Sequence, residues 1–433
     1  MKSNMMKMIE DLTPLNRVFC SSDYDKVIEY LGKELDFFTH RYTNKEQING
    51  WVIPPKWDVI EAKITCNGEL IYDGLQHPLS VIALSKSFKG TVTLPELLSH
   101  LHFDHRFPNA IPYHFRQLYR SWERDWGFCV TENFYNELKN IDTTFLYDVE
   151  IVTKEEEGTL KVLVSNLSIY NKPTFFFVAH LDHPGMSNDD LAGCAVGIEL
   201  LNRLKALKLK NNYVLVLLQE DIGSEYFLND KSLFLDSIPC ESLFLEMLGS
   251  KTQLALQESR SGDSNIEIAC KKAMDDLNID HKTGAYNTIA GNDEKLWETY
   301  GIPMASLSRY PYPEYHCSLD NPTIISEESL ETSVQILLKT VENLEKTKFV
   351  YKKFEGNICL SNPKYDLYVE YAQPAFGEEV TEEMTKMFEL MNLVPILHKP
   401  RTIAWIANKV GMDKEAVELY LRKWEERGLV EIK

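Results

Sequence analysis

Residues 173–190 read PTFFFVAHLDHPGMSNDD, and this stretch decides which fold the chain adopts. Its apolar run, Phe175–Ala179, stands ahead of a Pro-Gly turn, which is typical of a strand buried on both faces. His180, Asp182 and His183 come directly after the run. In open α/β sheets, ligands bind at the carboxyl ends of the strands. The stretch therefore predicts a buried strand that delivers a histidine and carboxylates to a metal site at the sheet edge.

Strand and helix patterns alternate on both sides of this stretch. Apolar runs predict strands at about 161–165, 213–218, 242–245 and 304–307, and helical spacing predicts helices at about 191–205, 265–277 and 326–346. Alternation of this kind favours a largely parallel sheet that helices cover on both faces. The predicted fold class is α/β, with a mixed, largely parallel sheet sandwiched by helices.

A β-rich region precedes the alternating part of the chain. After Pro54-Pro55 the sequence changes to short β-type runs such as VIEAKIT, ELIYD and GTVTL, several of them separated by turn residues. A helical pattern at residues 24–38 comes before this region and needs a core on which to pack. We therefore expect residues 57–157 to be a domain inserted into an α/β domain made of residues 1–56 and 158–350.

The last part of the chain has a sequence pattern that differs from those of the two regions before it. A weakly patterned linker at 351–374 is followed by a predicted domain at 375–433, where TIAWIANKV, a glycine turn, KEAVELYLRKWEER and GLVEIK give the winged-helix order. From Glu378 to Lys433 there are 9 basic and 11 acidic residues, whereas a DNA reader should be basic. We expect this domain to contact a protein partner or to form a homo-oligomer.

Composition limits the partners and the compartment. The chain has 433 residues and a formal net charge of −19, which gives no electrostatic footprint for nucleic acid or an anionic membrane. No apolar run is long enough for a transmembrane helix, and the N-terminus does not resemble a secretory signal. The eight cysteines are scattered and none forms a CxxC pair, which indicates reduced thiols in a cytoplasmic protein.

Four segments place acids or histidines where strands end or loops return. They are HLDHPGMSNDDLAG at 180–193, EDIG at 220–223, EMLG at 246–249 and YHCSLD at 315–320. Each segment alone is a weak signal, because a histidine or acid pair occurs often by chance. Together they offer imidazole and carboxylate ligands for divalent metals, with a further carboxylate that can carry a proton. The joint pattern predicts a metal-dependent hydrolase.

HLD with NDDLAG, then QEDIGS, FLEMLG and YHCSLDN resemble, in order and spacing, the zinc-dependent aminopeptidases that include bacterial leucyl aminopeptidase and glutamate carboxypeptidase. The resemblance covers about residues 160–345 and implies one or two zinc ions. It implies that the metal ligands are His180, Asp189 as the bridging carboxylate, Asp221, Glu246 and His316. It makes Glu220 the general base that deprotonates water, and Asp182 the residue that holds the His180 imidazole.

Further residues are assigned to the substrate, which is expected to be a small peptide or amide. Asp293, in AGNDEKLWETYGIP, resembles a pocket residue of the family, and Tyr315 lies beside the last histidine ligand. Arg260 could bind a substrate carboxylate. Two predicted ligands depart from the family pattern, because Asp221 stands where glutamate is commoner and Glu246 where aspartate is commoner. Each exchange changes the reach of the side chain by one methylene.

The whole chain also resembles a narrower group of bacterial aminopeptidase-like proteins with an inserted β domain and a C-terminal winged helix. RVF near Arg17, WDVIEAKI, IPYHF, WGFC, HLDHP and YPEYHCSLDN carry this resemblance. Three functions stay open at this point. The first is an aminopeptidase, the second an amidase or deacylase on a non-peptide substrate such as an acylated amino sugar. The third is a non-catalytic ligand-binding regulator that uses the winged helix.

Overall fold

The apolar run of the opening stretch forms strand β9 (Pro173–His180), and all eight of its residues are buried. This computed structural model describes residues 2–45, 48–141, 144–165, 172–234, 238–370, 379–398 and 400–433, with the backbone alone for 234 and 238–240. β9 lies inside an eight-stranded sheet of order β1-β8-β10-β9-β11-β14-β12-β13. The other bounds are β1 (Phe38–Tyr42), β8 (Leu160–Val164), β10 (Asn212–Leu218), β11 (Ile238–Glu246), β12 (Leu254–Gln257), β13 (His281–Gly284) and β14 (Met304–Ser308).

The centre of this sheet is parallel. β9 pairs in parallel with β10 and β11, and β11 pairs in parallel with β14. β1, β8 and β12 add antiparallel pairings towards the two edges. The mixed, largely parallel sheet predicted from the sequence is therefore confirmed. Because the register pairs His180 with Leu218, the neighbouring strands end at the same edge.

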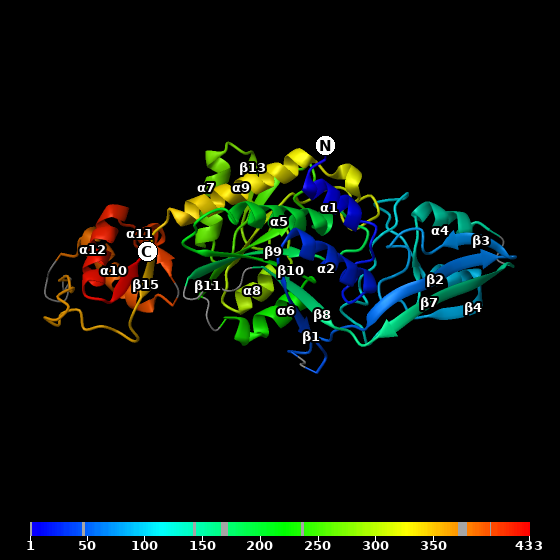
Figure 1. Cartoon of the computed structure of the whole chain (residues 1–433), viewed down its shortest axis with the longest axis horizontal. Helices are drawn as coiled ribbons and strands as arrows, with labels where there is room; N and C mark the ends of the chain where they lie inside the picture. The colour runs from blue at the N-terminus through cyan, green and yellow to red at the C-terminus, as the bar shows by residue number, and fades with distance from the viewer. Residues whose placement is uncertain are drawn as a thin grey trace.

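Helices cover both faces of the sheet, as Figure 1 shows. One face packs against α1 (Asn4–Leu12), α2 (Ser22–Glu34), α5 (Gly193–Leu204), α7 (Asn265–Asp276) and α9 (Glu327–Glu345) in one apolar core. The other face packs against α6 (Ile222–Asn229) and α8 (Glu294–Thr299). Within the described residues, no helix is long and apolar enough to cross a membrane.

The predicted N-terminal helix is shorter than expected. Helical spacing suggested residues 24–38, but α2 ends at Glu34 and Leu35 has an extended backbone. Phe38 then begins β1, which pairs antiparallel with β8 at the edge of the sheet. Leu35 is buried in the same core as α2, so its apolar side chain continues the helical pattern past the end of the helix. Residues before and after the β-rich region thus belong to one sheet.

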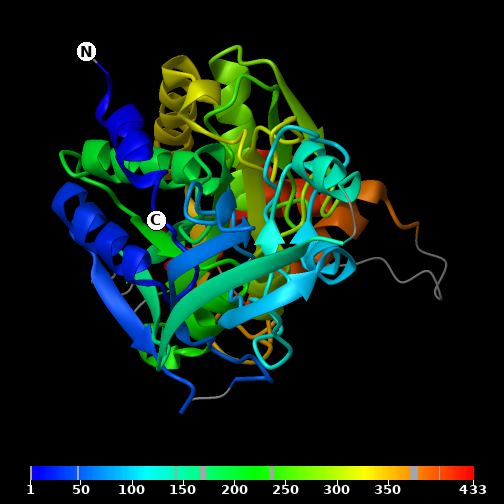
Figure 2. The same ribbon diagram turned by 90° about the vertical axis from the view of Figure 1, so that its right-hand side faces the viewer.

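The β-rich region forms a second sheet at one end of the molecule (Figure 1). Its order is β3-β2-β7-β4, and Figure 2 views the molecule from this end. The elements are β2 (Lys56–Cys66), β3 (Glu69–Asp73), β4 (Phe88–Thr93), α3 (Leu94–Ser99), β5 (Leu101–His102), β6 (Phe128–Cys129), α4 (Glu132–Lys139) and β7 (Leu146–Glu156). Its buried apolar residues form one cluster with those on the face of the large sheet that packs against α6 and α8.

The C-terminal residues form a third sheet with three helices. β15 (Phe349–Lys352) lies between β16 (Arg401–Thr402) and β17 (Val430–Ile432), beside α10 (Glu382–Leu393), α11 (Ile403–Val410) and α12 (Lys414–Glu426). The sheet thus begins two residues before the predicted linker. Residues 371–378 and 399, where part of the linker and of the predicted domain fall, lie outside the described residues. The winged helix stays a prediction.

Two chain segments cross closely where the second sheet joins the first. A Cβ on Gly158 would stand 1.8 Å from the carbonyl oxygen of Pro54, which is a backbone atom and cannot rotate away. Pro54 precedes β2, and Gly158 lies between β7 and β8. The crossing therefore needs a glycine for lack of space.

We expect Gly158→Ala to lower the free energy of unfolding by about 1–3 kcal/mol or more, because the two segments must move apart. Gly32→Ala is the matched control: Gly32 is exposed on α2, and its added Cβ meets no atom within 4 Å. That control should be neutral or stabilise by about 0.5–1 kcal/mol, since alanine favours helix. Thermal unfolding midpoints of both variants test the crossing, and equal midpoints would contradict it.

Candidate metal centre

The carboxyl ends of the parallel strands bring the predicted residues to one edge of the sheet. His180 is the last residue of β9, and Glu246 is the last residue of β11. Glu220 follows β10 after one intervening residue, and Asp221 is the N-cap residue before α6. Three segments separated by dozens of residues in sequence therefore meet in space. This is the edge at which open α/β sheets bind ligands.

The loop that carries Asp189 is held by Asp320. The Asp320 carboxylate accepts backbone N–H bonds from Ser187 at 3.0 Å, Asn188 at 2.6 Å and Asp189 at 3.1 Å. It also accepts the Tyr312 hydroxyl at 2.6 Å. Burial raises the pKa of Asp320 to about 6, although these donors act against that rise. The final aspartate of YHCSLD thus fixes the backbone that presents Asp189.

Asp190 ties the strand ends together. Its carboxylate accepts the backbone N–H groups of His180 at 3.3 Å, Gly193 at 3.0 Å and Met247 at 2.9 Å. These donors belong to the end of β9, the start of α5 and the residue after β11. A Cβ on Gly193 would lie 2.3 Å from the Leu245 carbonyl oxygen, so α5 begins in close contact with β11. Asp190, the second aspartate of NDD, is therefore a structural residue next to the cluster.

Six side chains form three overlapping groups in which the possible ligand atoms all lie within 4.8 Å of one another. The groups are His180, Asp189 and Glu246; His183, Asp189 and His316; and His180, His183 and Glu220. Asp189 Oδ2 lies 3.0 Å from His316 Nε2 and 3.8 Å from His183 Nε2. Asp189 belongs to two groups that share no other residue, which is the position expected of a bridging carboxylate.

The cluster contains buried polar atoms without hydrogen-bond partners in the described part of the chain. They include His180 Nδ1, His183 Nδ1, Asp189 Oδ1 and Glu246 Oε2. Buried polar atoms in proteins nearly always have a hydrogen-bond partner, so several unpartnered atoms in one place indicate a site for a bound ligand. Imidazole nitrogens and carboxylate oxygens are the donors that zinc and similar divalent ions accept. The residues present therefore fit a divalent cation.

Burial and charge shift the pKa values of the cluster in opposite directions. Burial raises the pKa of Glu246 well above its usual value, and the nearby Asp189 raises it further. Burial would also raise the pKa of Asp189, but His183 and His316 hold it well below its usual value. Burial would lower the pKa of His180, but Asp293 raises it well above the ordinary value. The cluster therefore consists of buried ionisable groups, each of which shifts the pKa of its neighbours.

Glu220 lies beside the groups and is positioned by two contacts. Its backbone N–H donates to Asp182 Oδ1 at 2.9 Å, and its Oε2 accepts the Tyr119 hydroxyl at 2.8 Å. His183 Nε2 is 3.7 Å from the same Oε2. The sequence argument had assigned Asp182 to the His180 imidazole. In the structure, Asp182 instead orients Glu220, and burial raises the pKa of Asp182 to about 6.

Asp293 takes the contact that had been predicted for Asp182. Its Oδ2 contacts His180 Nε2, and both side chains are buried. The predicted substrate residue therefore lies behind a candidate ligand, where it sets the orientation of the imidazole. Asp293 is also the residue before α8, which places it at the same sheet edge.

Two other predicted residues lie outside the three groups. Asp221 is 3.2 Å from Lys295 Nζ, and no group formed by the described residues includes it. Arg260 is exposed and follows β12, whose end points towards the opposite edge because β12 runs antiparallel to β14. Its backbone N–H donates to Glu298 near the end of α8. The structure does not bring Arg260 to the cluster.

Residues between β5 and β6 bring aromatic side chains to the site, which the sequence did not predict there. The Tyr113 ring packs edge-on against the imidazoles of His183 and His316, with ring centroids 5.6 Å and 5.5 Å apart. Its backbone N–H donates to the His316 carbonyl at 2.9 Å, and the Tyr315 ring stacks on the His316 imidazole. The IPYHF motif was noted in the sequence, but its partner segment lies some 200 positions later. His183, which the sequence places directly after HLD, was not among the predicted metal ligands.

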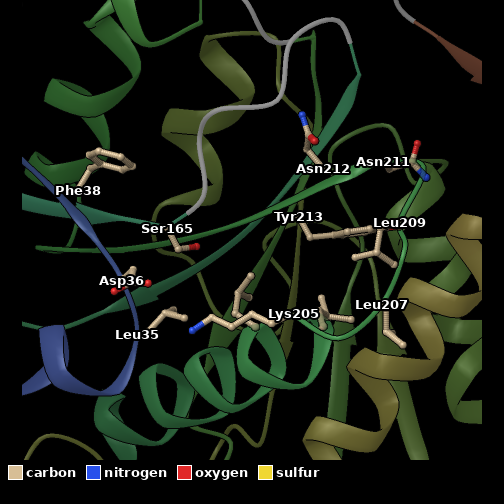
Figure 3. Close-up of a pocket in the computed structure, with 12 residues that line it drawn as sticks. Leu35, Asp36, Phe38, Ser165, Lys205, Leu207, Leu209, Asn211, Asn212 and Tyr213 are labelled. Atoms are coloured by element: carbon tan, nitrogen blue, oxygen red, sulfur yellow. The ribbon is translucent and has the colours of Figure 1, made fainter.

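A cavity of about 340 Å³ lies beside Glu246 and is lined by Met247, Asn287, Thr288, Ile289, Ala290, Gly291, Asn292, Tyr310 and Tyr315. The Asn292 amide contacts Glu246. A larger cavity of about 500 Å³ lies elsewhere, and Figure 3 shows it with Tyr213, Asn211 and Lys205 at its wall. Tyr213 is at the start of β10, whereas the cluster lies at the ends of the strands. The smaller cavity is therefore the one that adjoins the cluster.

Solved structures with this fold are known. A Clostridium acetobutylicum protein provisionally described as a peptidase superposes with a TM-score of 0.72 and 21% identity, covering 99% of this chain and 96% of that one. BSAP, a zinc aminopeptidase from Bacillus subtilis, superposes with a TM-score of 0.58 and 13% identity, covering 78% of this chain and 94% of that one. At these identities the likeness shows a shared fold.

Sequence comparison adds a relative and a family. A Clostridium acetobutylicum protein is 25% identical over 346 residues, which are 79% of this chain and 77% of that protein. Its name provisionally assigns it to polysaccharide biosynthesis and gives it an aminopeptidase-like domain. A family model described as a domain of unknown function, DUF4910, matches residues 6–347, and the chain belongs to this family.

Proposed function

We propose that the chain is a zinc-dependent hydrolase, an aminopeptidase that removes N-terminal residues from peptides. The observation that carries this proposal is the pair of ligand groups that share Asp189, with Glu220 beside them. The shared fold of zinc aminopeptidases supports it. His180 and Glu246 would hold one ion with Asp189, and His316 would hold a second with Asp189.

The proposed mechanism divides the work between the metal and the protein. Zinc, when bound, supplies Lewis-acid polarisation of a carbonyl and makes hydroxide accessible near neutral pH. Tyr119 donates to Glu220 Oε2, which lies 3.7 Å from His183 Nε2, and so holds the carboxylate beside the groups. The Glu220 carboxylate takes a proton from the attacking water and returns it to the leaving nitrogen. Asp182 keeps the Glu220 backbone in place during both transfers.

A second candidate function acts on a non-peptide amide. The name of the Clostridium relative, which refers to polysaccharide biosynthesis, favours an acylated amino sugar as the substrate. The same cluster would hydrolyse either amide, so the chemistry does not distinguish them. Hydrolysis of a panel of aminoacyl chromogenic substrates and N-acylated amino sugars would decide between the two, because each function predicts turnover in only one half of the panel.

Glu220→Gln should lower kcat by about 10²–10⁴-fold, because the amide cannot accept the proton. Its metal content should match that of the unchanged protein. The control is Glu199→Gln on α5, where the carboxylate pairs with Arg203 at 2.7 Å. That control should retain full activity. A Glu220→Gln protein with normal turnover would overturn the proposed base.

Metal removal should both stop turnover and destabilise the fold. Dialysis against a chelator leaves the buried carboxylates and imidazoles without their cation, and a ligand at 100 times its Kd contributes about 2.7 kcal/mol to stability. The thermal unfolding midpoint should therefore fall by several degrees and recover when zinc is added back. Elemental analysis of the same samples gives the metal content. An unchanged midpoint in a protein that never binds metal would contradict the proposed function.

A further inference from the structure

We infer that His183, and not Asp221, is the protein ligand that completes the second metal group with Asp189 and His316. This inference rests on the proposed function, because it concerns the same centre. It replaces a carboxylate ligand by an imidazole, and it therefore changes which metals the second group should prefer.

Asp221 contacts Lys295 and Asp293, outside the three ligand groups. Its carboxylate lies 3.2 Å from Lys295 Nζ, and its backbone N–H donates to Asp293 Oδ2 at 3.3 Å. The residue is the N-cap of α6 and has a φ of 59°. Lys295 lies beside the Asp221 carboxylate, whose Oδ1 makes no hydrogen bond within the described residues, and none of the three groups formed by those residues includes Asp221.

His183 belongs to the group with Asp189 and His316, which does not include Asp221. Its side chain is 2% exposed, and its Nε2 lies 3.8 Å from Asp189 Oδ2. Its ring centroid is 5.5 Å from that of His316. Its Nδ1 lies 4.0 Å from Asp182 and makes no hydrogen bond within the described residues. A buried imidazole that faces a shared carboxylate and a second imidazole is arranged as a ligand would be.

The backbone that carries His183 is clamped from the N-terminal segment. The Arg17 side chain is fully buried and donates to the carbonyl oxygens of Leu181 at 3.2 Å, Met186 at 2.8 Å and Leu12 at 2.7 Å. It also donates to the carbonyl oxygen of His183 itself. Arg17 thus fixes the backbone of the turn that carries His183. It is a positioning residue, because this backbone sets where the imidazole lies before any metal binds.

The inserted domain packs against the same two imidazoles. Tyr113 contacts the rings of His183 and His316 and bonds to the backbone of His316, so it sets the separation of the two histidines. A site with two imidazoles and one carboxylate suits zinc, cobalt or nickel better than magnesium, calcium or manganese, which favour oxygen ligands. The second group should therefore load with zinc or cobalt and remain empty in magnesium.

The test counts metal ions rather than turnover. His183→Gln should lower the zinc content from about two equivalents to about one, because the second group loses a ligand. It should also remove the part of the visible cobalt spectrum that the second equivalent contributes. Asp221→Asn is the matched control and should retain both equivalents. The inference is overturned if Asp221→Asn loses the second ion while His183→Gln keeps it.

Two further measurements keep the outcome clear. If His183→Gln does not fold, His183→Glu supplies an oxygen ligand that reaches about as far as the imidazole Nε2 and should bind two equivalents with a changed cobalt spectrum. An unchanged spectrum would overturn the role of His183. A wild-type protein that binds no metal would overturn the proposed function itself. A wild-type protein that binds one equivalent at every loading would overturn the second group and leave the first intact.

Discussion

Burying several carboxylates together is the constraint on which the rest of this structure depends. Asp182, Asp189, Asp190 and Glu246 lie side by side at a sheet edge, and each is about 1–2% exposed. Uncompensated buried charge costs several kcal/mol per ion. The fold therefore surrounds these groups with backbone N–H donors and imidazoles. Asp190 is satisfied entirely by strand and helix ends, whereas Asp189 and Glu246 keep oxygens for something else.

The parallel register makes this concentration possible. β9, β10 and residues 241–246 of β11 are buried throughout, so their positions in the sheet follow from burial, and their carboxyl ends bring His180, Glu220 and Glu246 to the same edge. Asp320 and Asp293 return from later segments to orient Asp189 and His180. His180 and Asp320, which are 140 positions apart in the sequence, thus meet at one point, and the loops between the segments only need to reach that edge.

Much of this could be predicted from sequence, because strand burial and the order of motifs are local signals. The α/β sheet and the meeting of the four polar segments at strand ends followed from such signals, and the family resemblance singled out His180, Asp189, Glu246 and His316 within them. The rest depends on side-chain directions and on long-range pairings. Whether Asp182 turns to His180 at the end of β9 or to the backbone of Glu220 just after β10 is decided by the strand register. Sequence spacing does not reveal it. The contact between Tyr113 and His316 is likewise invisible along the chain.

The pairing of residues 111–113 with 316–318 has a consequence for how the molecule is made. Ile111 and Ser318 exchange backbone and side-chain hydrogen bonds, and Tyr113 bonds to His316. Domains generally form as the chain leaves the ribosome, N-terminal part first. Residues 56–156 are all synthesised long before residue 316. Residues 111–113, which lie between β5 and β6, therefore already exist when the last histidine of the cluster is made, and the centre is completed late in synthesis.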